Sequence, residues 1–376
     1  MGNFCNVCRK DEELKNEETF PEISATQKYI SQNLFTQSFE KKLPQFGSYC
    51  SYPDYESKLP QNIKNYIKQN PIKFKKNISN KEIYDTPQPV EFKNGNLYCG
   101  SWNKESEMHG YGKYLLKEDN VLIEGIWEKG ILKLGRIFLP NGDIYEGEIK
   151  NSLFNGKGKM IYSNGTIFEG DFINGEKGNY GKMIYDDGSY YLGNFKNDLP
   201  NGKGEFKWND GFYYKGNFID GKIEGDGEIR NEKSGSFYKG NFKNNLFHGK
   251  GIFNFNSKSI YEGDYYLGKK DGEGLYKKYD GIKYNGNFSN GKLNGTGIVE
   301  DENYIYKCTW RNGFAVETPI IEVKNSDSAH TGNLDLNFKV EDEDIDMEKI
   351  KYLERDFNEN VTDSSYKINP GFVEVA

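Results

Sequence analysis

The chain has 376 residues and a formal net charge of −7; 35% of its residues are apolar, 15% are aromatic, and 43 are glycine. So few aliphatic residues argue against a thick globular core, and no run of about 18 apolar residues is present to span a bilayer. Residues 98–314 carry 30 basic and 30 acidic side chains, which excludes the basic face of a nucleic-acid-binding protein, so no nucleic-acid partner is predicted.

The first eight residues, MGNFCNVC, carry the features of an acylation signal. Gly2 is the acceptor that N-myristoylation requires, and Cys5 and Cys8 lie where palmitoylation commonly follows, although Asn6 replaces the usual Ser or Thr. Because one acyl chain binds a membrane only marginally, both signals together predict anchoring at a cytoplasmic membrane face. The alternatives are an unmodified start and half of a zinc site, which has no second Cys/His pair to complete it. No metal or cofactor is predicted.

Residues 1–90 form an N-terminal extension that is expected to be largely irregular. Between residues 58 and 81 it has seven lysines and no acidic residue, which predicts weak contact with anionic lipid, or else a solvated linker. A short helix is expected over residues 61–70, ended by Pro71, with Ile63, Tyr66 and Ile67 on one side. The seven lysines are Lys58, Lys64, Lys68, Lys73, Lys75, Lys76 and Lys81.

Residues 91–316 repeat an aromatic-x-Gly-x-aromatic phrase at intervals of 22–25 residues. A fixed short period is typical of repeat architectures. Ten copies are present, and the second and tenth are degenerate. They are Tyr98-x-Gly100-x-Trp102, Ile123-x-Gly125-x-Trp127, Tyr145-x-Gly147-x-Ile149, Phe168-x-Gly170-x-Phe172, Tyr191-x-Gly193-x-Phe195, Tyr214-x-Gly216-x-Phe218, Tyr238-x-Gly240-x-Phe242, Tyr261-x-Gly263-x-Tyr265, Tyr284-x-Gly286-x-Phe288 and Tyr306-x-Cys308-x-Trp310.

Each copy alternates with the period of a β-strand. Tyr145, Gly147 and Ile149 point to one face, which we expect to be buried, while Glu146 and Glu148 point to water. A glycine between two aromatic residues leaves room for side chains of a neighbouring strand to cross it. A second glycine-rich segment, such as Gly156-x-Gly158, predicts a return strand that completes a hairpin. Most aromatic residues are expected in the core, and the rest are expected to line a groove.

The turns that join each return strand to the next copy contain Asn-Gly or Asp-Gly. These pairs favour two-residue type I′ turns, so every strand should pair with its sequence neighbour in an antiparallel meander. Twenty strands at about 4.8 Å each predict an all-β, single-layer rod roughly 95 Å long. The pairs are Asn141-Gly142, Asn164-Gly165, Asp187-Gly188, Asp210-Gly211 and Asp280-Gly281.

This tandem pattern resembles the MORN repeat (membrane occupation and recognition nexus) over about residues 98–314. The resemblance implies an elongated array that acts as a scaffold, dimerises, or binds lipid or peptide partners along a groove. Two departures are expected to bend the rod locally: Leu134-Gly135-Arg136, which lacks the second glycine of copy two, and an inserted segment, Asn231–Gly235.

Residues 317–376 form an acidic tail without the repeat. Its 6 basic and 15 acidic side chains, counted from residue 315, favour disorder. The alternatives are an acidic segment that docks a partner and a cap over the last strand edge. A short helix over residues 346–357 would place Ile350, Leu353 and Phe357 on one stripe.

No sequence motif of an enzyme is present, so no catalytic residue is predicted. The chain has no phosphate-binding loop, nucleophile elbow or kinase motif. Its only histidines are His109, His248 and His330, and the first two occupy the same turn position in different copies. We therefore expect a non-catalytic scaffold for protein partners at a membrane, with a homodimer formed through an end copy. The alternatives are a ciliary or cytoskeletal component without lipid, as the resemblance implies, and direct lipid binding by the array.

Overall fold

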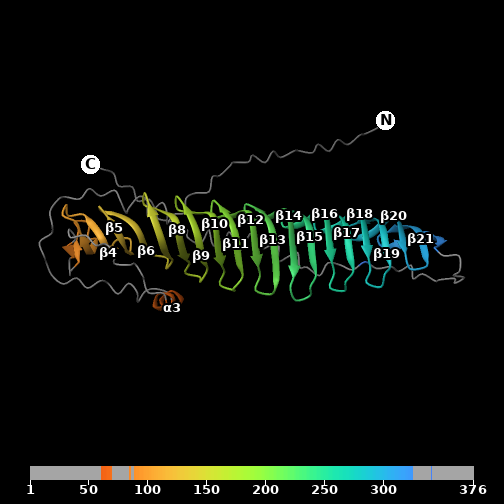
Figure 1. Cartoon of the computed structure of the whole chain (residues 1–376), viewed down its shortest axis with the longest axis horizontal. Helices are drawn as coiled ribbons and strands as arrows, with labels where there is room; N and C mark the ends of the chain where they lie inside the picture. The colour runs from red at the N-terminus through yellow and green to blue at the C-terminus, as the bar shows by residue number, and fades with distance from the viewer. Residues whose placement is uncertain (1–60, 70–83, 86–88, 325–339, 341–376) are drawn as a thin grey trace, which may run out of the picture.

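The computed structural model describes residues 61–69, 84–85, 89–324 and 340. It consists of one helix, α3 (Gln61–Gln69), and a single 23-stranded antiparallel sheet. The sheet confirms the predicted all-β meander, and α3 lies where a helix was expected. Figure 1 shows the strands side by side in chain order along one elongated array. Among the described residues, no helix has the length and hydropathy to cross a bilayer.

The strands form nine hairpins and a tenth repeat strand, with short pairing segments at each end. The first and last strands are β1 (Tyr84–Asp85), β2 (Val90–Glu91), β22 (Phe314–Ala315) and β23 (Ile320–Val323). The repeat strands are β3 (Leu97–Trp102), β5 (Val121–Glu128), β7 (Ile144–Lys150), β9 (Ile167–Ile173), β11 (Tyr190–Lys196), β13 (Phe212–Ile219), β15 (Phe237–Lys243), β17 (Ile260–Tyr266), β19 (Lys283–Ser289) and β21 (Tyr304–Arg311). The return strands are β4 (Met108–Leu116), β6 (Ile131–Phe138), β8 (Leu153–Ile161), β10 (Glu176–Ile184), β12 (Leu199–Lys207), β14 (Lys222–Asn231), β16 (Leu246–Asn254), β18 (Lys269–Lys277) and β20 (Lys292–Glu300).

The two ends of the hairpins use different turns, which corrects the predicted turn chemistry. In the turn after β6, only Gly142 has a positive φ (89°), and its amide bonds to the Leu139 carbonyl at 3.0 Å. This is a three-residue loop, a type I turn that ends in a left-handed glycine, and not a type I′ turn. The type I′ turns lie at the opposite ends of the hairpins. Asn174 (φ 50°) and Gly175 (φ 97°), between β9 and β10, are one example.

The type I′ turns also join successive hairpins. The Gly175 amide donates to the Phe154 carbonyl of the preceding return strand at 2.8 Å, and Gly221 bonds to Pro200 in the same way at 2.9 Å. Similar bonds recur from Gly130, Gly268, Gly291 and Gly313. Each hairpin is therefore held to its predecessor by a turn contact in addition to the sheet ladder.

The motif glycines form one unbroken line across the sheet, which we call the glycine row. Gly147 pairs with Gly158, Gly158 pairs with Gly170, and the pairing continues to Gly297, which faces Cys308. The row is Gly100, Gly112, Gly125, Gly135, Gly147, Gly158, Gly170, Gly181, Gly193, Gly204, Gly216, Gly227, Gly240, Gly251, Gly263, Gly274, Gly286 and Gly297.

Tyrosine rings explain why the row must be glycine. A Cβ atom at Gly147 would lie 2.6 Å from the Tyr145 hydroxyl, and one at Gly158 would lie 2.6 Å from the same oxygen. The ring therefore covers the glycine of its own strand and the glycine of the next strand, whereas the sequence predicted only side chains of a neighbouring strand. The hydroxyl donates to the Glu148 carbonyl at 2.7 Å. The equivalent bond, to the residue three positions on, forms at Tyr98, Tyr191, Tyr214, Tyr238, Tyr261 and Tyr284.

The aromatic core lies on the face of the sheet that these rings cover, which we call the aromatic face. Tyr191 packs edge to face on Phe195 of its own copy (centroids 5.0 Å apart) and on Phe218 of the next copy (5.1 Å). Edge-to-face contacts within one copy and with the next copy alternate in this way from Tyr145 to Trp310. Such pairs contribute about 0.5–1.5 kcal/mol each beyond simple burial.

A bulge in each hairpin folds this core inward. Gly193 pairs with Gly204 and Phe195 pairs with Pro200, so three residues of β12 face a single residue of β11. Extra residues on one strand bend that strand. The part of the hairpin between the bulge and the type I′ turn therefore packs over the tyrosine ring. Tyr145 accordingly stacks on Phe154 at 3.7 Å.

Candidate functional site

The opposite face of the sheet, which we call the outward face, carries the polar residues that flank the motif glycines. Shallow depressions between these residues follow the glycine row from β10 to β19. Three of them, of about 650, 440 and 640 Å³, adjoin one another because they share Lys215 and Asp226 or Lys239. Their floor contains Gly193, Gly204, Gly216, Gly227, Gly240, Gly251, Gly263 and Gly274. We call this surface the glycine groove.

Alternating charges line the first part of the groove. The Lys215 ammonium lies 2.6 Å from a Glu205 oxygen, and Arg230 pairs with Glu228. The hydrogen bond between Lys215 and Glu205 lowers the pKa of the Glu205 carboxyl and raises that of the Lys215 ammonium. These exposed pairs fix side-chain positions more than they stabilise the fold. They balance one another, so the groove has no strong net charge.

The second part of the groove carries exposed aliphatic side chains. Ile252 is 39% exposed and Leu275, two strands further along, is half-buried. Both line the third depression together with Lys239 and Glu262. Further along, Ile298 is 39% exposed. These three residues lie 23 positions apart on successive return strands. A polypeptide lying along the groove would meet backbone at the floor, charges on the walls and, on β16, β18 and β20, one apolar contact per return strand.

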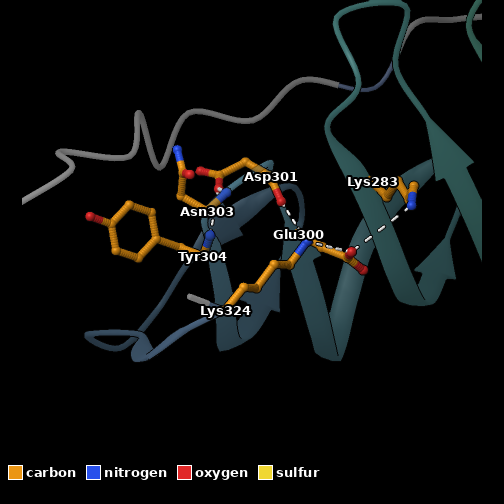
Figure 2. A network of polar contacts seen from close by, with 6 residues as sticks. All are labelled: Lys283, Glu300, Asp301, Asn303, Tyr304 and Lys324. Carbon is orange, nitrogen blue, oxygen red and sulfur yellow. Dashed lines mark hydrogen bonds and ion pairs between the residues drawn. The ribbon is translucent and has the colours of Figure 1, made fainter. Parts of the chain in front are cut away.

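The C-terminal edge of the sheet has its own polar network, shown in Figure 2. Asp301 accepts hydrogen bonds from the backbone amides of Asn303 (2.8 Å) and Tyr304 (2.7 Å), which closes the turn between β20 and β21. Lys324 donates to the Asp301 carbonyl at 2.6 Å and pairs with Glu300, which also lies 3.9 Å from Lys283. These contacts attach the end of β23 to the last hairpin and lower the pKa of the Glu300 carboxyl.

The structure places the motif residues in the core and leaves the lipidation residues outside the described part of the chain. All the tyrosines, phenylalanines and Trp102 predicted as repeat-core residues are buried. Of the seven lysines, Lys64 and Lys68 belong to α3, and Lys68 is exposed. Gly2, Cys5, Cys8 and the other five lysines, as well as the acidic tail helix expected over residues 346–357, lie outside the described residues.

Two degenerate copies show how the core adapts. Copy two has Ile123 in place of tyrosine, and a Leu132 methyl group takes the space over Gly125, 2.6 Å from where a Cβ would stand. In copy ten, Cys308 ends the glycine row, and the Tyr306 hydroxyl bonds to Asp301 at 3.3 Å instead of to a carbonyl of its own strand.

Two buried lysines were missed by sequence reasoning. Lys177 and Lys270 are 3% and 1% exposed, and they occupy the core position that phenylalanine fills in β8 and β16. The Lys177 ammonium lies 3.1 Å from the Tyr162 hydroxyl and 3.6 Å from Asp198. The Lys270 ammonium lies 5.2 Å from the Phe255 ring centroid. Comparing equivalent positions among the copies would have revealed both.

The histidines and acidic residues do not form a recognisable reactive centre in the described region. His109 lies in β4 and His248 in β16, so both are strand residues and not the turn residues that were expected; each precedes a glycine with positive φ, Gly110 (88°) and Gly249 (59°). Within residues 61–69, 84–85, 89–324 and 340, no cluster of three or more His, Cys, Asp or Glu is arranged to hold a metal ion.

Comparison with known families identifies seven of the ten copies as MORN repeats. The matched segments are residues 98–119, 145–167, 168–190, 191–212, 238–260, 261–283 and 284–303. The unmatched copies begin at Ile123, Tyr214 and Tyr306, and these contain the missing glycine, the Asn231–Gly235 insertion and Cys308. They nevertheless form the same strands. A search among characterised protein sequences found no significant match.

Three solved structures are distantly similar to this chain. The TCP domain of Drosophila melanogaster SAS-4, in complex with a proline-rich motif of Ana2, is 15% identical, with 38% of this chain and 77% of that chain covered and a TM-score of 0.26. The TCP10 domain of Danio rerio CPAP, in complex with a STIL peptide, is 10% identical, with coverages of 62% and 97% and a TM-score of 0.25. Virginiamycin B lyase from Staphylococcus aureus is 11% identical, with coverages of 64% and 87% and a TM-score of 0.12. At these scores the likenesses carry no argument about function.

Proposed function

Because this chain belongs to the MORN-repeat family, we propose that it is a non-catalytic scaffold that docks protein partners along the glycine groove. The observation that supports this function best is the groove itself, which runs unbroken along ten strands at about 4.8 Å each. A surface that is long, shallow and repetitive suits an extended or helical segment of a partner protein better than a small substrate.

The aliphatic part of the groove supplies the test of docking. Ile252→Asp puts a charge on an exposed groove wall, so it should reduce the partners recovered by proximity labelling or cross-linking in cells at least tenfold. Ile219→Asp is the matched control, because Ile219 is 53% exposed and does not line the three depressions of the groove. Both variants should keep the circular dichroism spectrum of the parent chain. Equal recovery with both variants would contradict docking at the groove.

The scaffold is proposed to sit at the cytoplasmic face of a membrane. The support is the sequence of the first eight residues, in which Gly2 would carry a myristoyl group and Cys5 and Cys8 a second acyl chain. Changing Gly2 to alanine should move most of the protein from the membrane pellet to the supernatant on cell fractionation. Intact-mass measurement of the native protein provides the control for acylation. An unchanged partition, or association with microtubules that resists salt and detergent, would exclude the anchor.

Self-association is proposed at the last strand. All four residues of β23 are exposed, with Ile320 at 67%, Ile321 at 52% and Val323 at 53%. An apolar edge strand can pair with the same strand of a second copy across a two-fold axis. Sedimentation velocity should therefore show a dimer of the parent chain, and Ile321→Lys should give a monomer. Ile173→Lys, at a residue 44% exposed far from this edge, should leave the dimer intact. A monomeric parent chain would refute the proposal.

A further inference from the structure

The outward face is buried at one end of the array, which a single-layer sheet cannot achieve alone. Six apolar residues, one on each of β3 to β8, are paired in one line that we call the aliphatic row. None of them is more than 7% exposed, and Ile144 is fully buried. The aliphatic row is Leu97, Leu115, Leu122, Phe138, Ile144 and Ile161.

Polar neighbours of the aliphatic row are buried as well. The Glu124 side chain is 8% exposed and pairs with Lys113 at 2.6 Å, and the Arg136 side chain is 4% exposed and pairs with Glu146. At the positions equivalent to Glu124 in later copies, Lys239 and Glu262 are exposed. The burial therefore belongs to this end of the array and not to the repeat pattern itself.

The burial decreases along the line. Ile167 and Ile184, which continue the line on β9 and β10, are half-buried, and Lys277 and Lys283, farther along it, are exposed. The aromatic core occupies the other face of the same strands. A second layer must therefore cover the outward face over β3 to β8.

We propose that this layer is the N-terminal extension of the same chain, with residues 20–39 lying along the aliphatic row. The chain joins the sheet at this end, because β1 and β2 both pair with β3. The C-terminal strand β23 pairs with β21, eighteen strand spacings or about 86 Å away. Residues 40–83 connect this segment to β1, beside the aliphatic row. Its local concentration there is therefore higher than that of the acidic tail, whose attachment point is distant.

The composition and spacing of residues 20–39 fit the aliphatic row. This segment contains seven large apolar or aromatic residues and only two charged ones, Glu22 and Lys28. Phe20, Ile23, Ile30 and Leu34 recur at intervals of three, seven and four, which is the spacing of one stripe on a helix. Such a stripe would be about 21 Å long. The aliphatic row spans five strand spacings, about 24 Å.

Under this proposal, the outward face binds the N-terminal extension at one end and leaves the glycine groove for partner proteins. The N-terminal extension covers β3 to β8, and the glycine groove begins at β10. An acyl group at Gly2 would then be held near the first hairpins. The proposal does not depend on the groove or on acylation, since it rests only on the burial of the aliphatic row.

The test is hydroxyl-radical footprinting of the full-length chain. Phe138 reports on the covered face, and Phe253, which is fully buried in the aromatic core, is the internal control. In the double variant Ile30→Asp/Leu34→Asp, oxidation of Phe138 should rise about tenfold while that of Phe253 stays unchanged. These substitutions lie outside the array, so the sheet should keep its folded spectrum.

A reciprocal pair of variants tests the array side. Ile144→Asp should increase hydrogen exchange of residues 20–39 about tenfold, whereas Ile260→Asp, at the half-buried equivalent position in copy eight, should not. The proposal is overturned if residues 20–39 exchange at the unprotected rate in the parent chain, or if Phe138 stays protected in the double variant. Loss of protection only on removing residues 325–376 would identify the acidic tail as the occupant, and protection that depends on protein concentration would identify a second copy.

Discussion

Replacing Gly216 with valine should lower the free energy of unfolding of the chain by about 3 kcal/mol or more. A Cβ atom at this position would meet the Tyr214 hydroxyl and would lie 2.7 Å from the Gly227 Cα of the paired strand. The ring cannot move away without breaking its hydrogen bond to the Asn217 carbonyl (3.1 Å). Urea unfolding followed by circular dichroism would measure the loss.

The matched control is Lys215→Val, one residue earlier in the same strand. The Lys215 side chain is 67% exposed on the outward face, so this change should alter the free energy of unfolding by less than about 0.5 kcal/mol. Equal stability of the two valine variants would show that the glycine row is not a steric requirement. Because repeat arrays unfold in parts, the comparison should use the first transition of each variant.

Changing Asp198 to asparagine should lower the free energy of unfolding by about 2–3 kcal/mol, because it leaves the Lys177 charge buried without its counter-ion. Asparagine keeps the turn conformation and an oxygen for the Lys177 amide, which bonds to Asp198 at 2.7 Å. Replacing Lys177 with phenylalanine in the same chain should recover the loss to within about 1 kcal/mol, since phenylalanine fills this position in β8 and β16. A double variant that is no more stable than Asp198→Asn would refute this account.

The lysine also predicts a dependence of stability on pH. Burial lowers the pKa of Lys177, but Tyr162 and Asp198 outweigh that effect and raise it above its usual value. A group whose pKa is raised on folding stabilises the folded state below its unfolded pKa, about 10.4 for lysine. The contribution should therefore be present at neutral pH and disappear as the pH rises above about 10. The Lys177→Phe variant should lack this alkaline loss.

The sequence predicted the strands well because the physical signals repeat. Period-two alternation around Gly147 placed Tyr145 on the buried face and Glu146 on the outward face, and ten copies made the meander the simplest arrangement. The turn types were assigned to the wrong ends because both ends carry similar dipeptides. Asn164-Gly165 closes a three-residue loop, whereas Asn174-Gly175 closes a type I′ turn. The two turns differ only in the number of residues that are left unpaired between the strands. That number depends on the register of strand pairing, which the dipeptide does not give.

The candidate site was harder to predict. The groove depends on how the strands bend at their bulges, and nothing in the pattern around Gly204 gives the direction of that bend. The covered end was not predicted either, because Leu122 and Ile144 occupy a line that holds Lys207 and Arg230 in later copies. This change from apolar to charged residues is visible only when the equivalent positions of all copies are compared. The proposed lipidation residues, Gly2, Cys5 and Cys8, remain a prediction from the sequence.

The antiparallel meander has a mechanical consequence. In this sheet the hydrogen bonds between strands run along the long axis of the molecule, because each strand crosses that axis. A load applied between the two ends would thus pass through every ladder in series, and the ladder with the fewest bonds would set the yield force. The two residue pairs that join β1 to β3, the two that join β2 to β3 and the four between β21 and β23 make both ends weaker than the internal ladders. Under such a load the array would lose its terminal strands first and keep the hairpins between them folded.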